Sequence, residues 1–337
     1  VLAEPGKAPR GVTSIVIEQG KIVALLEGRQ SGPAGAVVID LGSKFVLPGL
    51  IDSHVHLDSD AGGQAALIER VTTSPGLDAL RAQWNGMKTL RAGFTTVRNL
   101  GDGSGATLAL RDAVAAGWVQ GPRIIDAGRS ISVTAGHMDG TLSAVETAHL
   151  HGKKIAVHAH GTEGINLALA AGADSIEHGT VPNDETFRLF KQYGAYYVPT
   201  LSTINGYRER LAKDPNAYPP AVLEKVLWRL EITGKALQRA VPAGVKIAFG
   251  TDAGVSKHGR NADEFELMVE HGMTPATAIA AATVNAADLL GLKDEVGALR
   301  AGMAADLIAV DQDPLMDVKV LKNVAFVMKG GEVIKRD

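Results

Sequence analysis

The stretch GLIDSHVHLDSD, residues 49–60, joins an apolar run to two histidines that are one residue apart. The apolar run is typical of a buried β-strand, in which successive side chains point to opposite faces. His54 and His56 therefore project from the same face of this strand. Two imidazoles on one face are either a metal clamp or a pair packed in a core, and the rest of the chain decides between these alternatives.

Downstream of this stretch, short apolar strands alternate with amphipathic helical stretches. We predict strands at 51–57, 94–100, 122–127, 154–159, 174–178, 196–200 and 246–251, with helices between them, for example at 79–92, 143–151 and 220–241. This alternation predicts an α/β fold, a (β/α)8 TIM-like barrel with its active site at the carboxyl ends of the strands. Only seven strands are found, whereas a closed barrel of this class has eight.

Both ends of the chain have a different sequence pattern, in which pairs of short strand candidates are separated by turn residues. Strand candidates at 13–18 and 21–25 flank a Gln19-Gly20 turn, and strand candidates at 324–328 and 332–334 flank a Gly330-Gly331 turn. These patterns predict β-hairpins. We therefore expect residues 1–47 and 298–337 to form one small β-sandwich domain built from both termini, and residues 48–297 to form the barrel.

The composition limits which classes of function and of metal site are possible. The 337 residues carry a formal net charge of −3, which gives no reason to expect nucleic-acid binding, and no apolar run is long enough to cross a membrane. The absence of cysteine excludes disulfides and thiolate metal sites. The chain begins at Val1 without a methionine, so the compartment is left open between the cytoplasm and export with a removed signal peptide.

Metal-competent side chains lie at the carboxyl ends of several predicted strands. They are His54, His56, His158, His160, His178 and Asp252. Because the strand ends of a barrel converge on one mouth, these residues are expected to meet there. Neutral imidazoles with a carboxylate suit a divalent metal such as Zn²⁺. Alone, each histidine is more often a hydrogen-bonded rim residue and Asp252 more often a helix cap, but the joint pattern favours a metal centre.

These motifs resemble those of the metal-dependent amidohydrolase superfamily along essentially the whole chain. The shared motifs are DSHVH at 52–56, VHAHG at 157–161, IEHGT at 176–180, GTDAG at 250–254 and GALRAGMAADL at 297–307. Within the superfamily the chain is most similar to the imidazolonepropionase-like and Xaa-Pro dipeptidase-like branch, which includes ochratoxin-hydrolysing amidohydrolases. Segments typical of that branch are FTTVRNLG at 94–101, GHMD at 136–139 and HGRN at 258–261.

The resemblance implies two divalent metal ions, with Zn²⁺ as the expected metal. One metal would be held by His54, His56 and Asp252, and the other by His158 and His178. It also implies a small-molecule amide or dipeptide substrate and a homo-oligomer, with an octamer as one option.

The mechanism expected of such a site assigns roles to further residues. Asp252 would accept the proton of a metal-activated water and pass it to the leaving nitrogen. His137 would polarise the carbonyl, although an ordinary loop histidine is an equal alternative. His160 would contact the substrate or support the ligands, and Tyr207, His258 and Arg260 would bind a substrate carboxylate.

One implied residue is missing. Binuclear relatives share a carbamylated lysine at the end of strand four, but between His56 and His158 this chain has only Lys88, Lys153 and Lys154. Lys88 falls in a helix, and the other two start the strand of His158, at the wrong end of the barrel. The fourth strand itself is missing near Gly140-Thr141. Either the sequence omits a segment there, which we favour because a deleted central strand exposes two sheet edges, or the strand is deleted and the protein is mononuclear or inactive.

The leading hypothesis is a metal-dependent amidohydrolase that cleaves an amide bond and releases a C-terminal amino acid, with dipeptides, N-acyl amino acids or ochratoxin-type amides as substrates. Hydrolysis of a cyclic amide, as in imidazolonepropionase, is the enzymatic alternative. A catalytically dead metal-site scaffold is the alternative from another class.

Overall fold

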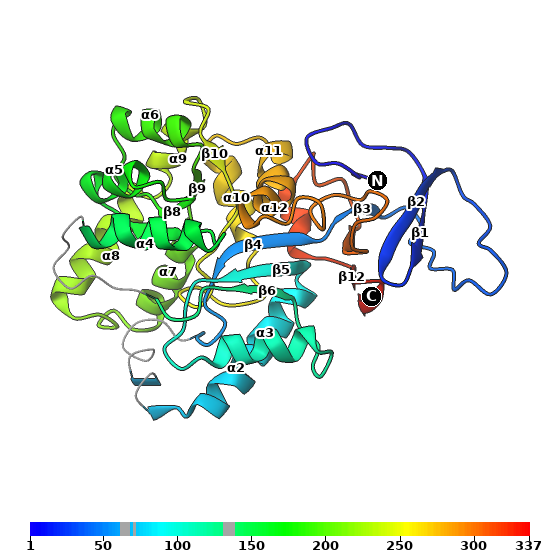
Figure 1. Cartoon of the computed structure of the whole chain (residues 1–337), viewed down its shortest axis with the longest axis horizontal. Helices are drawn as coiled ribbons and strands as arrows, with labels where there is room; N and C mark the ends of the chain where they lie inside the picture. The colour runs from blue at the N-terminus through cyan, green and yellow to red at the C-terminus, as the bar shows by residue number, and fades with distance from the viewer. Residues whose placement is uncertain (61–67, 70–71, 131–138) are drawn as a thin grey trace.

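The computed structural model describes residues 1–60, 68–69, 72–130 and 139–337, and its core consists of two parallel β-sheets with helices outside them (Figure 1). The first sheet has the order β4 (Leu50–Val55), β5 (Phe94–Asn99), β6 (Arg123–Asp126). The second has the order β10 (Lys246–Ile247), β9 (Tyr196–Val198), β8 (Ser175–His178), β7 (Ala156–Ala159).

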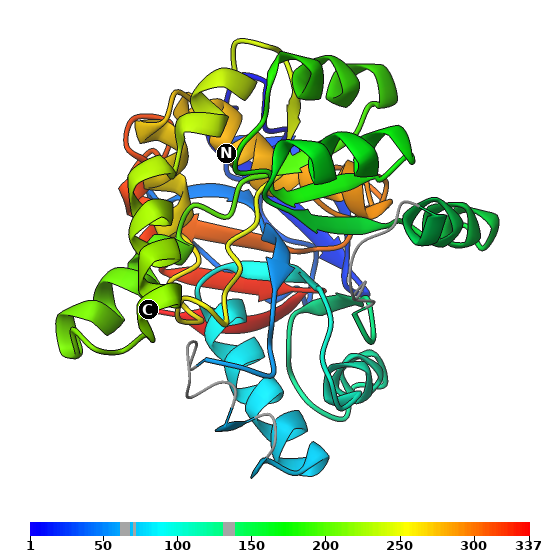
Figure 2. The same ribbon diagram turned by 90° about the vertical axis from the view of Figure 1, so that its left-hand side faces the viewer.

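Helices follow the strands along the chain and lie around the outside of the sheets (Figure 2). They are α2 (Pro75–Arg91), α3 (Ala106–Ala115), α4 (Asp139–Leu150), α5 (Thr162–Ala170), α6 (Asp184–Tyr193), α7 (Thr203–Lys213), α8 (Pro220–Ile232), α9 (Lys235–Ala240), α10 (Asp263–Glu270), α11 (Pro275–Ala280) and α12 (Ala286–Leu290). A π-helical turn, Ala281–Asn285, joins the last two. No helix in the described part of the chain is long and apolar enough to span a bilayer.

The two parallel sheets meet where β4 lies beside the segment that follows β10. The N–H of Ser53 donates to Phe249 O at 2.9 Å, and the N–H of Asp252 donates to His54 O at 2.8 Å. On the far side, β6 pairs only with β5 and β7 only with β8 among the described strands. The described strands therefore form an arc of seven that is open between β6 and β7. The predicted eighth strand is not among them, and α4 runs across Gly140-Thr141, where that strand was expected to be missing.

A separate antiparallel sheet takes strands from both ends of the chain. Its order is β13 (Glu332–Arg336), β12 (Phe326–Lys329), β11 (Leu307–Val310), β3 (Phe45–Pro48). The hairpin of β1 (Thr13–Glu18) and β2 (Lys21–Glu27) packs on it through an apolar cluster that includes Ile22 and Phe326. Both predicted hairpins are confirmed, while the division into a composite β domain and a barrel domain stays a prediction.

Two helix boundaries differ from the prediction for local reasons. The predicted helix 79–92 already begins at Pro75, because Ser74 Oγ accepts the N–H of Leu77 at 3.3 Å and a proline fits the first helical position. The predicted helix 220–241 is two helices, because Gly234 adopts a left-handed φ of 87° between α8 and α9.

Three buried phenylalanines join strands and a helix in the core. The ring centroid of Phe265 in α10 lies 4.5 Å from that of Phe249 and 6.5 Å from that of Phe94. All three rings are fully buried. This cluster therefore ties α10 to β5 and to the segment after β10.

Replacing Phe265 by alanine should lower the free energy of unfolding by about 3–5 kcal/mol, because it removes a fully buried ring and leaves a cavity. Urea titration followed by circular dichroism measures this change. Trp118, which is 82% exposed, provides the aromatic control. Trp118→Ala should change stability by no more than about 0.5 kcal/mol. Equal losses in the two variants would contradict this account of the core.

Candidate metal centre

The five predicted ligands meet at the carboxyl ends of the parallel strands. Their ligand atoms form two groups, each lying within 4.8 Å: His54 with His56 and Asp252, and His54 with His158 and His178. His54 belongs to both groups. The strands carry these residues from distant parts of the sequence to one place, as the strand-end pattern predicted.

In the first group, two imidazole nitrogens face one carboxylate. Nε2 of His54 and Nε2 of His56 each lie 3.4 Å from Asp252 Oδ1. The other ring nitrogens are held by the protein: Nδ1 of His54 lies 2.8 Å from Glu177 Oε2, and Nδ1 of His56 lies 3.2 Å from Gly101 O. Because both acceptors require a donor, each Nδ1 carries the proton and each Nε2 offers a lone pair.

The residues fit a metal by a further criterion. Nε2 of His54 is buried and has no hydrogen-bond partner among the described residues. A buried polar atom without a partner costs about 1–3 kcal/mol, so such atoms usually mark a missing ion or water. A divalent cation between this nitrogen and Asp252 would satisfy both.

In the second group, the two histidines point ring nitrogens at each other. Nε2 of His178 lies 3.3 Å from Nδ1 of His158, and Nδ1 of His178 lies 2.8 Å from Thr200 Oγ1. The ring centroid of His54 is 4.7 Å from that of His158. His178 is buried, whereas His158 is exposed, because β7 lies at the open edge of its sheet.

The electrostatics keep His158, His178 and Asp252 in the protonation states that metal ligands need. Partial desolvation and the positive charge of His54 lower the pKa of His158 to about 4, and full burial lowers that of His178 well below its usual value. Burial raises the pKa of Asp252, but the adjacent His54 and His56 outweigh it and hold this pKa well below its usual range. His158 and His178 are therefore neutral beside the ionised carboxylate of Asp252, and neutral imidazoles with a carboxylate suit Zn²⁺.

The pKa of His54 shifts in the opposite direction. Burial lowers its pKa, but the negative charges of Asp252 and Glu177 and the hydrogen bond to Glu177 raise it to about 9. Two carboxylates thus attract positive charge to this imidazole, which either a proton or a metal ion can supply.

The backbone at the site is strained. His178, Thr200 and Asp252 have φ angles of 70°, 49° and 57°, in the left-handed region that side-chain-bearing residues rarely adopt. Each lies just at or beyond the end of a strand. Such residues persist where the surrounding structure dictates their orientation, and they concentrate at functional sites.

The remaining predicted site residues divide into two sets. His160 lies beside the metal ligands, and Tyr207 lies within electrostatic reach of Asp252. The ring of His160 stacks on that of His178 with centroids 4.7 Å apart and an interplanar angle of 8°. Burial, and next the negative charge of Asp252, raise the pKa of Tyr207, which places its hydroxyl in the field of the site. His137 lies outside the described residues.

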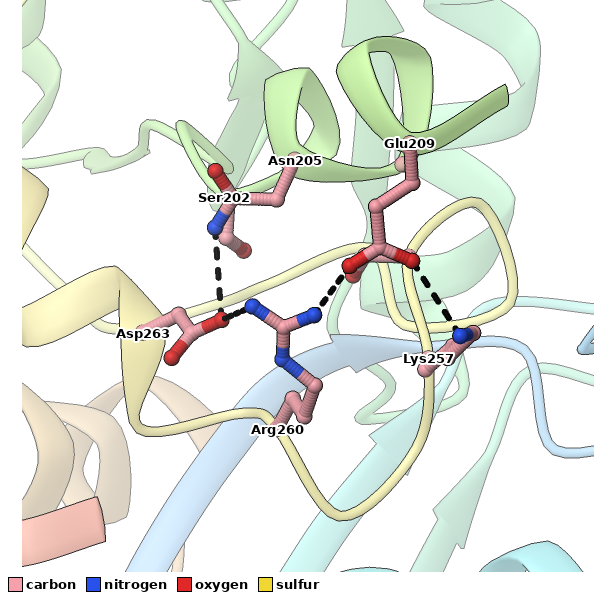
Figure 3. Close-up of a pocket in the computed structure, with 8 residues that line it drawn as sticks. Ser202, Asn205, Glu209, Lys257, Arg260 and Asp263 are labelled. Atoms are coloured by element: carbon pink, nitrogen blue, oxygen red, sulfur yellow. Dashed lines mark hydrogen bonds and ion pairs between the residues drawn. The ribbon is translucent and has the colours of Figure 1, made fainter. Parts of the chain in front are cut away.

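His258 and Arg260 are engaged elsewhere. His258 is buried, with Nδ1 3.2 Å from Thr89 Oγ1 and Nε2 3.0 Å from the carbonyl oxygens of His56 and Ser59. It therefore holds the loop after β4. Figure 3 shows Arg260 in a small polar pocket, paired with Glu209 and with Asp263, the latter at 2.6 Å. Their predicted contact with a substrate carboxylate stays a prediction.

One residue at the mouth was not singled out from the sequence. Arg229, on α8, donates through Nη1 to Thr180 Oγ1, and among the described residues it forms no ion pair with a carboxylate. Thr180 Oγ1 lies 2.8 Å from Nδ1 of His160. Because arginine can only donate, the hydroxyl hydrogen of Thr180 is free for His160, which leaves Nε2–H of that ring as a donor. A single arginine in a predicted helix gave no signal of this role.

The three lysines between His56 and His158 have partners or positions away from the ligands. Nζ of Lys88 lies 2.8 Å from Asp60 Oδ2 and 3.0 Å from Asn85 Oδ1, and Nζ of Lys154 lies 3.1 Å from Asp174 Oδ1. Lys153 is exposed. None of these three therefore serves as the implied bridging lysine in the part of the chain that the structure describes.

Known proteins match this chain across the site. A model of the amidohydrolase family matches residues 45–143 and 132–334. An ochratoxinase of Aspergillus niger is 30% identical over 86% of this chain and 75% of its own length. The structure of a Xaa-Pro dipeptidase with bound methionine in the active site superposes with a TM-score of 0.89 at 33% identity, covering 95% of this chain and 94% of that chain. A prolidase complexed with N-methylphosphonate-L-proline gives 0.83 at 26% identity, covering 96% and 95%.

These matches bear on the fold and on the missing strand. The structural likeness shows a TIM-barrel-like α/β fold. The two parts of the family match overlap at 132–143, near the start of α4. The alignment with the ochratoxinase runs over 377 residues, which exceeds the 337 residues of this chain, so that relative has residues without a counterpart here. The longer alignment supports an absent segment, and the overlap in the family match supports its place near Gly140-Thr141; the segment stays a prediction.

Because Nε2 of His54 belongs to both ligand groups and that of His56 to one, His54→Ala should lower the zinc content per chain more than His56→Ala does. Metal analysis after dialysis against Zn²⁺ gives the zinc content per chain. The exposed His151 provides the control, and His151→Ala should keep the wild-type content. Full zinc content in His54→Ala would contradict the assignment.

Proposed function

This chain belongs to the amidohydrolase family and is a metal-dependent hydrolase of C–N bonds, and on this premise we propose that it releases a carboxylate-bearing amino acid from an amide. The observation that carries the proposal is a guanidinium, Arg229, at the mouth of the metal centre. It forms no ion pair with a carboxylate among the described side chains. A substrate carboxylate would supply the missing anion.

We propose two Zn²⁺ ions at the two ligand groups. A divalent metal held there polarises the amide carbonyl and lowers the pKa of a water molecule. His54, His56 and Asp252 would hold one ion, and His158 and His178 the other. The carbamylated lysine of the family is not available in this chain, so the second ion would have fewer protein ligands.

Asp252 would move the proton. Its carboxylate is 7% exposed and stays ionised beside His54 and His56. From this position it can accept the proton of the attacking water and deliver it to the leaving nitrogen. The strained backbone at Asp252 fixes the direction of the carboxylate.

The carboxylate end of the substrate would lie near Arg229, Tyr207 and His160. Nε2–H of His160 and the guanidinium of Arg229 are donors linked through Thr180, and charge-assisted bonds of this kind are among the strong ones. The methionine and the proline analogue in the related structures are also carboxylates. This favours an N-acyl amino acid, a dipeptide or an ochratoxin-type amide over the cyclic amide of an imidazolonepropionase-like reaction. The homo-oligomer stays a prediction, as does the polarising role of His137.

Asp252→Asn should lower kcat by about 10²–10⁴-fold, because it removes the proton acceptor while changing little volume. Steady-state kinetics with a Zn²⁺-loaded enzyme and a measured zinc content separate this effect from metal loss. Asp184→Asn, at a fully exposed side chain, serves as the control and should leave kcat unchanged. A zinc-loaded Asp252→Asn enzyme with near-normal kcat would show that another group is the base.

Arg229→Met should reduce kcat/KM by about 10–100-fold for an N-acyl amino acid, since a hydrogen bond to a charged group contributes about 1.5–3 kcal/mol. The same substrate with its carboxylate converted to an amide should be hydrolysed equally by both enzymes. Arg208, exposed on α7, provides a control of equal charge change. If the variant loses activity on both substrates alike, the carboxylate assignment is wrong.

A further inference from the structure

Glu177 is a fully buried carboxylate that directly precedes the ligand His178 but faces His54 on another strand. Its Oε2 lies 2.8 Å from Nδ1 of His54. Its Oε1 accepts from Arg98 Nη2 at 2.7 Å and from Ser175 Oγ at 2.5 Å. Each oxygen of Glu177 therefore has its own partners: Oε2 accepts from the histidine, and Oε1 accepts from the arginine and the serine.

We infer that Glu177 is a positioning residue that holds Nδ1–H of His54 and so directs the Nε2 lone pair of this histidine at the metal. The inference rests on the metal centre of the proposed function. Nε2 of His54 is the buried nitrogen that lacks a partner among the described residues, and it points toward Asp252. Carboxylates that orient metal-bound histidines commonly change metal affinity 10–100-fold when they are replaced.

Arg98 keeps the carboxylate in place. Its side chain on β5 is 6% exposed and also donates through Nε to Ser53 O at 2.6 Å and through Nη1 to Ser175 Oγ at 3.2 Å. An isolated buried carboxylate would be costly, so the adjacent guanidinium is what permits an ionised glutamate at this depth. The oxygen that faces His54 is thereby left free of competing donors among the described residues.

The same geometry has a structural alternative. Arg98 lies in the sheet of β4, β5 and β6, and Glu177 lies in the sheet of β7 to β10. The pair therefore also fastens the two sheets across the interior. A purely structural clasp would change stability without changing how tightly a folded molecule binds zinc, so the two roles are separable by experiment.

The test measures Zn²⁺ affinity of the metal-free full chain by competition with a chromophoric chelator. Glu177→Gln keeps the size of the side chain but replaces a carboxylate that accepts from three donors with an amide that has only one accepting oxygen, and it should weaken the affinity of the His54 group about 10–100-fold. Ser175→Ala removes a hydrogen bond from the other oxygen only and should change the affinity by less than about threefold. The absorption spectrum of the Co²⁺-loaded protein should shift in Glu177→Gln and not in Ser175→Ala.

Folding is controlled in the same experiment by circular dichroism. If Glu177→Gln does not fold because it leaves Arg98 unpaired, the double variant Glu177→Met/Arg98→Met removes the charge pair as a unit, which proteins often tolerate. It should show the same loss of zinc affinity. A folded Glu177→Gln or double variant with wild-type affinity and an unchanged Co²⁺ spectrum overturns the inference alone. A wild-type protein that binds no Zn²⁺ overturns the inference together with the metal centre.

Discussion

His54 lies between two buried carboxylates, and the rest of the site depends on this arrangement. Nδ1 faces Glu177 at 2.8 Å, and Nε2 faces Asp252 at 3.4 Å. Each negative charge at this depth needs a positive partner. Arg98 and the hydrogen bond from His54 lower the pKa of Glu177 to about 2 even though burial raises it. On the Asp252 side, the charge is met by the surrounding imidazoles and, in the proposed enzyme, by metal.

The polar groups around this centre divide by what they touch. His258 bonds to the carbonyl oxygens of His56 and Ser59, and Arg260 pairs with Glu209 and Asp263, so both shape loops. Arg229 and His160 share Thr180 as a partner and keep donor capacity toward the mouth. The burial and positive charge that lower the pKa of His160 to about 4 keep its ring neutral. This separation explains how one crowded region can be both rigid and able to receive a substrate.

The open side of the strand arc affects one ligand group more than the other. β4 and the segment after β10 are paired with neighbours, so the group of His54, His56 and Asp252 is enclosed. His158 lies on β7, an edge strand in the described structure, and its side chain is exposed. A strand between β6 and β7 would cover this edge. An uncovered strand edge has free backbone groups that can pair with another chain. The proposed second metal would thus depend more than the first on the segment that we predict to be absent near Gly140-Thr141.

The sequence by itself determined the features that local periodicity dictates. Alternation along a strand places His54 and His56 on one face, and strand ends in a parallel sheet converge, so the five candidate ligands could be named without coordinates. The turn residues at Gln19-Gly20 and Gly330-Gly331 likewise specified the two hairpins. Strand ends were less exact, because the predicted strand 246–251 is regular only at Lys246–Ile247.

Only the tertiary structure decided which distant side chains meet. Glu177 and Arg98 are on different sheets, Arg229 reaches Thr180 from α8, and the ring nitrogens of His258 are taken up by Thr89 and by the backbone of residues 56–59. None of these pairings has a sequence spacing, because each depends on how helices and strands pack across the interior. The physical reason is that a hydrogen bond or an ion pair acts over about 3–4 Å, while sequence patterns fix only the face and the end of an element on which a side chain lies.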